Sequence, residues 1–168
     1  AAQADIGCLV ISAKQGEFES GFEKGGQTIE HAVLARSLGI RFLVCVVNKL
    51  DDPSINNAEA RFKEIREKML PVLKGQCGWN VDKDVSFVPV AALKKWNMDK
   101  AHKESPLNKW ASPNLSLIEH LDSLKILDRD KDKSLRFNVL DRFKDVSNFV
   151  FGKIESGTVV KNQPCIIY

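Results

Sequence analysis

The sequence predicts an α/β fold, a parallel sheet with flanking helices, followed by the start of an antiparallel β-barrel. Two nearly unbroken apolar runs, residues 5–12 and 41–47, have the composition of parallel strands that are covered on both faces. A segment with helical spacing of its apolar residues lies between them, which makes a β-α-β unit. After about residue 130 the pattern changes to short alternating runs separated by turn residues, which is typical of antiparallel strands.

The helices of the α/β part follow from the spacing of apolar residues. In residues 28–38 the spacing predicts a helix that ends at Gly39, where a C-terminal cap is expected. Residues 54–73 predict a second helix, with Phe62, Ile65 and Met69 at helical spacing. This helix leads to a third strand at residues 85–90, and we expect its crossover to be right-handed.

The remainder of the chain predicts one more helix and then a second domain. Residues 94–112 indicate a long polar loop, and residues 115–124 indicate a helix. The charged segment 128–133 indicates a linker, so we place a boundary near residue 130. Residues 1–130 are then one domain, and residues 131–168 are the first strands of the barrel. The apolar runs of the second domain are 135–139, 149–154, Val159-Val160 and Ile166-Ile167.

Composition excludes some classes of function. No apolar run approaches the roughly 20 residues that span a bilayer, so we expect no membrane role. The 25 Lys and Arg residues balance 22 acidic residues and are interspersed with them, which neither requires nor forbids contact with RNA. The four cysteines form no CxxC pair, and Cys8 and Cys45 lie in apolar runs, so we expect small buried side chains rather than disulfides.

The tetrapeptide Asn48-Lys49-Leu50-Asp51 follows directly on the second predicted strand, at the sheet edge where ligands of α/β proteins bind. A carboxylate only accepts hydrogen bonds, and guanine presents N1–H and its N2 amino group side by side, so Asp51 suits guanine and not adenine. Asn48 would support the loop and meet the base edge, while the methylenes of Lys49 would cover one purine face. A turn that merely ends a buried strand is the competing interpretation, since Asn and Asp are common in turns.

A second turn, Ala91-Ala92-Leu93, follows the third predicted strand at the same edge of the sheet. Two strand ends on one edge can share a crevice, which favours a nucleotide site over an isolated turn. The usual pattern of such sites has Ser in place of Ala91, with backbone amides that face the guanine carbonyl oxygen. We therefore expect a weaker pocket, made by Asn48, Lys49, Asp51, Ala91, Ala92 and Leu93.

A near match to a phosphate-binding loop occurs at residues 21–28. Gln27 occupies the position of the essential lysine, and the segment lies too far beyond its preceding strand. We interpret it as a glycine-rich loop that enters a helix capped near Thr28. Phosphate and magnesium ligands are then expected before Ala1, and we expect the chain by itself to hydrolyse no GTP and to hold no catalytic residue.

The other polar and aromatic residues predict ordinary roles. His31, His102 and His120 are scattered and pair with no nucleophile, and the three tryptophans are expected to anchor loops to the core. The lysines at 94, 95, 100 and 103 make a mildly basic loop, for which a solvated surface is the default interpretation and contact with ribosomal RNA the alternative.

Several motifs together resemble the family of eukaryotic release factor three, a group of translational GTPases similar to elongation factor 1-alpha. They are residues 19–28 with Glu30-His31-Ala32, the segment Asn48-Lys49-Leu50-Asp51-Asp52-Pro53, and residues 141–145 and 152–157. The resemblance covers nearly the whole chain. It departs at Ala91, at residues 146–148 and in the loop of residues 94–113.

The resemblance implies the C-terminal half of a P-loop GTPase domain, without the P-loop, and the first strands of barrel domain 2. It also implies a cytoplasmic GTPase that binds GTP or GDP with Mg²⁺ and assists a class-one release factor on the ribosome, without binding DNA. A ribosome-rescue GTPase or one that delivers aminoacyl-tRNA is the related alternative. Two alternatives of other classes stay open: an α/β enzyme in which the Asn-Lys-x-Asp segment is accidental, and a binding module without turnover.

Overall fold

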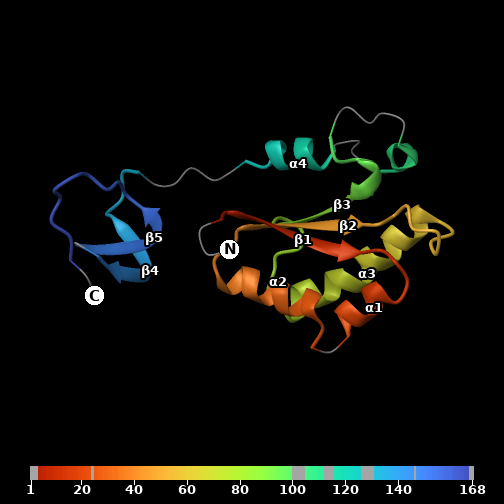
Figure 1. Cartoon of the computed structure of the whole chain (residues 1–168), viewed down its shortest axis with the longest axis horizontal. Helices are drawn as coiled ribbons and strands as arrows, with labels where there is room; N and C mark the ends of the chain where they lie inside the picture. Colours follow the sequence, from red (N-terminus) through yellow and green to blue (C-terminus); the bar gives the residue numbers. More distant parts are fainter. Residues whose placement is uncertain are drawn as a thin grey trace. The chain divides into compact units, whose positions relative to one another are not determined.

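The computed structural model describes residues 4–23, 25–99, 105–111, 116–125, 131–145 and 147–166. The chain divides into two compact units, Ala1–Lys125 and Ile126–Tyr168, each of which is described by itself (Figure 1). The boundary expected near residue 130 falls at residues 126–130, outside the described residues. None of the described helices is long and apolar enough to cross a membrane.

The first unit is built on a parallel three-stranded sheet, as the sequence predicts. Strands β1 (Ile6–Ser12), β2 (Phe42–Asn48) and β3 (Val85–Pro89) are ordered β1-β2-β3. Ser12 pairs with Asn48, and Val47 with Pro89, so the three strands end at the same edge. The residues that follow each strand are therefore brought to one side of the sheet.

Helices cover the two faces of this sheet unequally. Helices α1 (Glu17–Phe22), α2 (Gln27–Ser37) and α3 (Ala58–Gly75) lie on one side, and α4 (Leu117–Ser123) lies on the other (Figure 1). The larger core cluster includes Leu43, Cys45 and Val47 of β2 together with Ile65 and Met69 of α3. A smaller cluster of four valines packs against residues of α4 and its surroundings: Val44, Val46, Val88 and Val90.

The expectation that both apolar runs are covered on both faces is correct for β2 and wrong for β1. Cys45 is fully buried, whereas Cys8 is exposed and the side chain of Val10 is 61% exposed. Cys8 pairs with Val44, and Val10 with Val46, so both exposed residues belong to the face that carries the smaller cluster. That cluster is built from valines of β2 and of the β3 strand and its end, which leaves this part of the edge strand uncovered.

The glycine-rich segment before α2 contains more helix than the sequence predicts. Gly21 and Phe22 belong to α1, and α2 begins at Gln27 with Gly26, not Thr28, at its N-cap. A Cβ atom at Gly26 would collide with the carbonyl group of Gly21, so this close approach of two backbone segments requires glycine. Glycine at position 26 is therefore required by the way in which the end of α1 leads into α2.

Helix α3 begins four residues later than the start of its predicted segment and ends two residues later than predicted. Asn57 is its N-cap, and its Oδ1 accepts a hydrogen bond from the Ala60 amide at 3.0 Å. Ile65, Met69 and Leu73, spaced by one helical turn, are fully buried against the sheet. Capping chemistry, more than apolar spacing, thus sets where this helix starts.

The segment expected to be a long polar loop, residues 94–112, contains the 3-10 helix η2 (Pro106–Lys109) and begins at the last residue of another, η1 (Ala92–Lys94). Leu107 is 1% exposed, and the buried Asn97 donates from Nδ2 to the Pro89 carbonyl at 2.7 Å. The described part of this segment therefore packs on the core at Asn97, Leu107 and Ala111, whereas Lys94 and Lys95 are exposed, as a solvated surface requires. Residues 100–104, including His102 and two of the lysines, and residues 112–115 lie outside the described residues.

Helix α4 is held to β3 by a half-buried histidine. His120 Nε2 lies 2.7 Å from Ser86 Oγ, and burial lowers the pKa of His120 below its ordinary value. A lowered pKa means that the folded state binds a proton less readily than the unfolded chain does. Stability is then retained above the ordinary value, about 6.5, and is lost as the pH falls below it.

We therefore expect the urea midpoint of the protein to fall more between pH 7.5 and pH 5.5 in the parent than in His120→Gln. The substitution removes the group that titrates and keeps a side chain able to hydrogen bond with Ser86. His31→Gln, at an exposed position of α2, is the matched control for replacing a histidine by glutamine. An equal loss of stability in the parent and in His120→Gln would contradict this role for His120.

The second unit is a two-stranded antiparallel sheet of β4 (Arg136–Lys144) and β5 (Asn148–Ser156). The change from parallel to antiparallel strands agrees with the sequence prediction. Residues 157–166 contain no strand, so the apolar pair Val159-Val160 extends neither strand, and Ile167 lies outside the described residues. Several large side chains of the sheet are about half exposed: Val139, Leu140, Phe143, Phe149, Val150 and Phe151.

Candidate functional site

The two turns that the sequence singles out lie side by side at the carboxyl edge of the sheet. The Val90 amide donates to the Val47 carbonyl at 2.8 Å, and the Leu50 amide donates to the Val90 carbonyl at 3.4 Å. Parallel pairing of β2 and β3 continues in this way into the two turns. Residues about 40 positions apart in the sequence are thus brought together at one edge of the sheet.

Asn48 joins the two turns through its side chain. Its Oδ1 accepts hydrogen bonds from the Ala92 amide at 3.0 Å and from the Lys49 amide at 2.7 Å. The first bond ties the end of β2 to the turn after β3, and the second shapes the turn that contains Asp51. The asparagine therefore supports the loop, the first of the two roles predicted for it.

Lys49 adopts a left-handed backbone conformation with φ of +64°, and its side chain turns toward α1. Its Nζ lies 2.6 Å from Glu17 Oε2, which also accepts a hydrogen bond from Ser12 Oγ at 2.8 Å. The hydrogen bonds from Lys49 and then from Ser12 lower the pKa of Glu17 to about 2. The carboxylate is therefore ionised at neutral pH and holds the far end of the lysine.

Glu17 is a residue of this region that the sequence analysis missed. It follows β1, whereas Lys49 follows β2, and nothing in the local pattern of residues 13–20 indicates a partner 32 positions away. The only available signal was that parallel strands end together, so an acidic residue just after the first strand can reach a basic residue just after the second.

Asp51 is largely buried and has a cationic neighbour, Lys94. Its side chain is 15% exposed, and Lys94 Nζ lies 3.6 Å from its Oδ2. The ammonium group of Lys94 also lies over the indole ring of Trp96, 4.7 Å from the ring centroid. A carboxylate in this setting can accept hydrogen bonds from a ligand, and a positive charge stands beside it.

The second turn uses most of its backbone amides within the chain. The Ala91 amide donates to the Trp96 carbonyl at 3.1 Å, and the Ala92 amide donates to Asn48. The side chain of Leu93 is 94% exposed and contributes no apolar wall. The turn is therefore rigid, but the Ala91 and Ala92 amides, predicted to face a base, already have acceptors.

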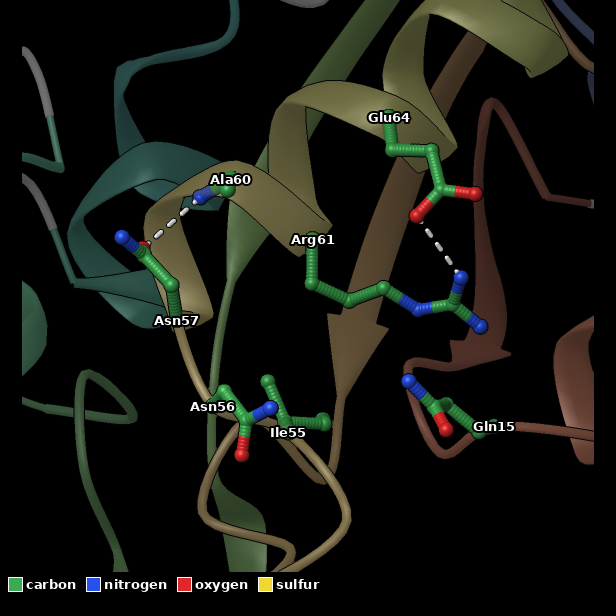
Figure 2. Close-up of a pocket in the computed structure, with 7 residues that line it drawn as sticks. All are labelled: Gln15, Ile55, Asn56, Asn57, Ala60, Arg61 and Glu64. Carbon is green, nitrogen blue, oxygen red and sulfur yellow. Dashed lines mark hydrogen bonds and ion pairs between the residues drawn. The ribbon is translucent and has the colours of Figure 1, made fainter.

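A hollow of about 210 Å³ lies near the same edge but is lined by other residues. Figure 2 shows Arg61 reaching from α3 toward Gln15, with Ile55, Asn56 and Asn57 on the opposite wall. None of the six residues predicted to bind a nucleotide lines this hollow. It is a recess beside α3, and the residues of the two joined turns do not line it.

Arg61 connects three elements around that recess, and the sequence analysis did not single it out. It is 8% exposed and donates from Nε to the Ala13 carbonyl at 2.9 Å. Its guanidinium also forms ion pairs with Glu19 of α1 and Glu64 of α3, both at 2.8 Å. Burial opposes ionisation of Glu19, but hydrogen bonds led by that from Arg61 leave its pKa below the ordinary value.

The described residues offer no metal centre. Within these parts of the chain no group of three or more His, Cys, Asp or Glu side chains gathers around a common point. The four cysteines are free, in line with the expectation of no disulfide framework. We therefore assign none of the described residues to a metal ion.

Comparison with known proteins identifies the family. The model of the elongation factor Tu GTP binding domain matches residues 1–143. The eukaryotic peptide chain release factor GTP-binding subunit of Schizosaccharomyces pombe is 44% identical over 99% of this chain and 25% of its own length. The protein of the same name from Dictyostelium discoideum is 45% identical over 97% of this chain and 29% of its own.

Two solved structures agree in fold. Sup35 complexed with GDP is 44% identical, with a TM-score of 0.67, over 96% of this chain and 39% of that chain. Sup35 complexed with GMPPNP is 43% identical, with a TM-score of 0.68 over the same shares. The chain spans about a quarter of the length of the curated relatives it matches.

These relatives carry the name that the sequence motifs suggested, so the resemblance to eukaryotic release factor three is confirmed. The parallel sheet with its helices and the antiparallel strands after it are the fold expected from that resemblance. The chain belongs to the family of elongation factor Tu GTP-binding domains.

Proposed function

We propose that this chain carries the guanine-recognising part of a translational GTPase that assists stop-codon-dependent polypeptide release on the ribosome. The observation that carries the proposal is the hydrogen bond from the Ala92 amide to Asn48 Oδ1, which joins the two turns beside Asp51. The names of the relatives, release factor GTP-binding subunits, support the termination step.

Three side chains of the joined turns have a role in base recognition: those of Asn48, Lys49 and Asp51. Asp51 accepts hydrogen bonds from guanine N1–H and the N2 amino group, which adenine does not offer as a pair. Asn48 holds the two turns together, and the methylenes of Lys49, fixed at their far end by Glu17, cover one purine face. Ala91, Ala92 and Leu93 belong to the second turn, whose backbone forms the other side of the proposed site. A wrongly paired base would leave the largely buried carboxylate without its partners, and this cost produces selectivity.

The proposed ligands and domains are those of the intact protein. We propose GTP and GDP as ligands, supported by the GMPPNP and GDP complexes of Sup35. Magnesium would accompany the nucleotide phosphates, but the described residues do not form a site that fits it, and no step is derived through it. Residues 1–130 would be part of the GTP-binding domain and residues 131–168 the first strands of the barrel domain, acting in the cytoplasm.

The partners follow from the same role. A class-one release factor and the ribosome are the proposed partners, and no DNA or membrane is involved. Residues 1–168 contain no phosphate-loop lysine, so the chain by itself is proposed to be without GTP turnover.

Competition binding to the intact protein tests the nucleotide class. We expect GDP to displace a fluorescent guanine nucleotide at concentrations at least 10³-fold below those needed for ADP, because mispairing strands a desolvated carboxylate. Equal displacement by ADP would reject the proposal and favour an α/β enzyme with an accidental motif.

A reconstituted termination reaction tests the biological step. We expect the intact protein to accelerate peptide release by a class-one release factor at a stop codon in the presence of GTP. Guanine selectivity without such acceleration, together with delivery of aminoacyl-tRNA or rescue of stalled ribosomes, would assign the protein to the related elongation or rescue GTPases.

A further inference from the structure

Helix α4 is attached at its N-terminus to the segment that follows the second turn. The Leu117 amide donates to the Asn97 carbonyl at 2.9 Å, and the Ile118 amide donates to the Met98 carbonyl at 3.1 Å. The first amides of a helix have no partner within the helix, and two of them are satisfied here by residues 97 and 98. A displacement of α4 would therefore break bonds to this segment.

Asn97 ties the same segment to the end of β3. The residue is 4% exposed, and its Nδ2 donates to the Pro89 carbonyl at 2.7 Å. Its backbone is left-handed, with φ of +59°, a conformation that asparagine adopts more readily than most residues. Loss of the side-chain bond would leave a buried donor and a buried acceptor unpaired. Asn97 thus holds α4 through its carbonyl and β3 through its side chain.

The turn after β3 is joined to Asn97 by a short bridge. The Ala91 amide donates to the Trp96 carbonyl at 3.1 Å, and the Trp96 amide donates to the Ala91 carbonyl at 3.0 Å. Asn97 follows Trp96 directly in the chain. The start of α4 is therefore only one residue removed from the bridge that closes the turn.

Helix α4 is itself an element that is either docked or lost. It has seven residues, too few for a helix that is stable alone, so it depends on its contacts with the sheet. Leu117 and Leu121 pack against the smaller cluster of valines, and His120 contacts Ser86, but Ile118 is 50% exposed. Elements with so little buried surface open locally before the whole domain unfolds.

We propose that Asn97 is a positioning residue that couples the docking of α4 to nucleotide binding at the sheet edge. The proposal rests on the function proposed above and adds a means of regulating that site. A docked α4 fixes the turn before the nucleotide arrives, whereas an undocked α4 leaves the turn to be ordered at the expense of binding energy. Coupling is reciprocal, so a bound nucleotide must hold α4 in place to the same degree.

Hydrogen exchange of the intact protein, followed by mass spectrometry with and without saturating GDP, tests the coupling. We expect GDP to slow exchange of the α4 amides at least about fivefold in the parent, the lower end of measured couplings. The amides of α3, which packs in the larger core cluster, report the general stabilisation by a bound ligand.

Asn97→Gly separates the two contributions. Glycine keeps the left-handed backbone and removes the side-chain bond to Pro89. The protection of α4 by GDP should fall below about twofold, less than the couplings usually measured, while that of α3 remains. Asn97→Asp should have the same effect, because a carboxylate of similar shape cannot donate to the Pro89 carbonyl.

Ile65→Val is the matched control for a general loss of stability. It removes one methylene from the larger core cluster, on the face of the sheet opposite α4 (Figure 1). Protection of α4 by GDP should stay at the parental level in this variant. An equal loss of protection in Ile65→Val and in the Asn97 variants would assign the effect to stability in general and overturn the proposal.

Two further results would overturn it. One is protection of α3 but not of α4 by GDP in the parent, a comparison that needs no variant. The other is full protection of α4 in Asn97→Gly, or in Asn97→Asp if the glycine variant does not fold. Failure of the proposed function is distinguishable, because GDP would then not bind and neither helix would be protected.

Discussion

Replacing Asp51 with Asn is expected to weaken GDP binding by the intact protein about 10²-fold or more and to create a preference for xanthosine diphosphate. Two hydrogen bonds to a carboxylate, each contributing about 1.5–3 kcal/mol, are lost or inverted when the acceptor-only group becomes an amide. The amide can donate to the carbonyl at position 2 of xanthine, where guanine carries an amino group. Competition of both nucleotides against a fluorescent analogue measures the change.

Asp52→Asn is the matched control for this substitution. It makes the same chemical change one residue along the chain, where Asp52 Oδ1 accepts a hydrogen bond from the Ser54 amide at 2.9 Å. The asparagine oxygen can keep that bond, so guanine preference should persist. Unchanged guanine preference in Asp51→Asn would remove Asp51 from the site, whatever the affinity of the control.

Replacing Arg61 with Met should have the largest effect on stability. The substitution leaves the Ala13 carbonyl without its side-chain donor. It also removes the cation that forms ion pairs with both Glu19 and Glu64. Removing one member of a buried ionic network lowers the free energy of unfolding by about 3–5 kcal/mol. Because the two carboxylates are partly exposed, we expect the loss for Arg61→Met to be at the lower end, about 3 kcal/mol. For a unit of this size that lowers the melting temperature by about 10 °C.

The aromatic neighbourhood of Arg61 adds to this expectation. The guanidinium lies 5.4 Å from the ring centroid of Phe18, which is 3% exposed and anchors α1 to the core. Loss of Arg61 therefore loosens α1, and with it Glu17 and the lysine that Glu17 holds. Thermal unfolding followed by circular dichroism measures the effect.

Arg66→Met on the exposed side of α3 is the control and should shift the melting temperature by no more than a degree or two, as about ±0.5 kcal/mol is usual for surface sites. Glu19→Gln keeps an acceptor for Arg61 and should give an intermediate loss. If Arg61→Met and Arg66→Met had the same melting temperature, the ionic network around Arg61 would not stabilise the fold. If Arg61→Met does not fold, the loss in Glu19→Gln relative to the parent decides the matter.

Local pattern was enough to predict most elements and to place the two turns of the proposed site after β2 and β3. The run from residue 41 is buried on both faces as β2, and the spacing of Ile65 and Met69 identified α3. The Asn48–Asp51 segment was placed correctly after β2, because strand identity and turn chemistry are encoded within a few neighbouring residues. The short helix α1 was missed, since six residues that include a glycine carry little helical signal without the burial of Phe18.

The contacts that shape the site join residues far apart in the chain and needed the folded structure. Asn48 and Ala92 are 44 positions apart, and Arg61 and Ala13 are 48 apart. Lys94 was interpreted as part of a solvated basic loop, and only the fold brings it to Asp51. The exposure of Val10 also depends on the tertiary structure, because an apolar strand is buried only where another element covers it. Periodicity and turn residues describe what a segment prefers, whereas its partners depend on the path of the rest of the chain.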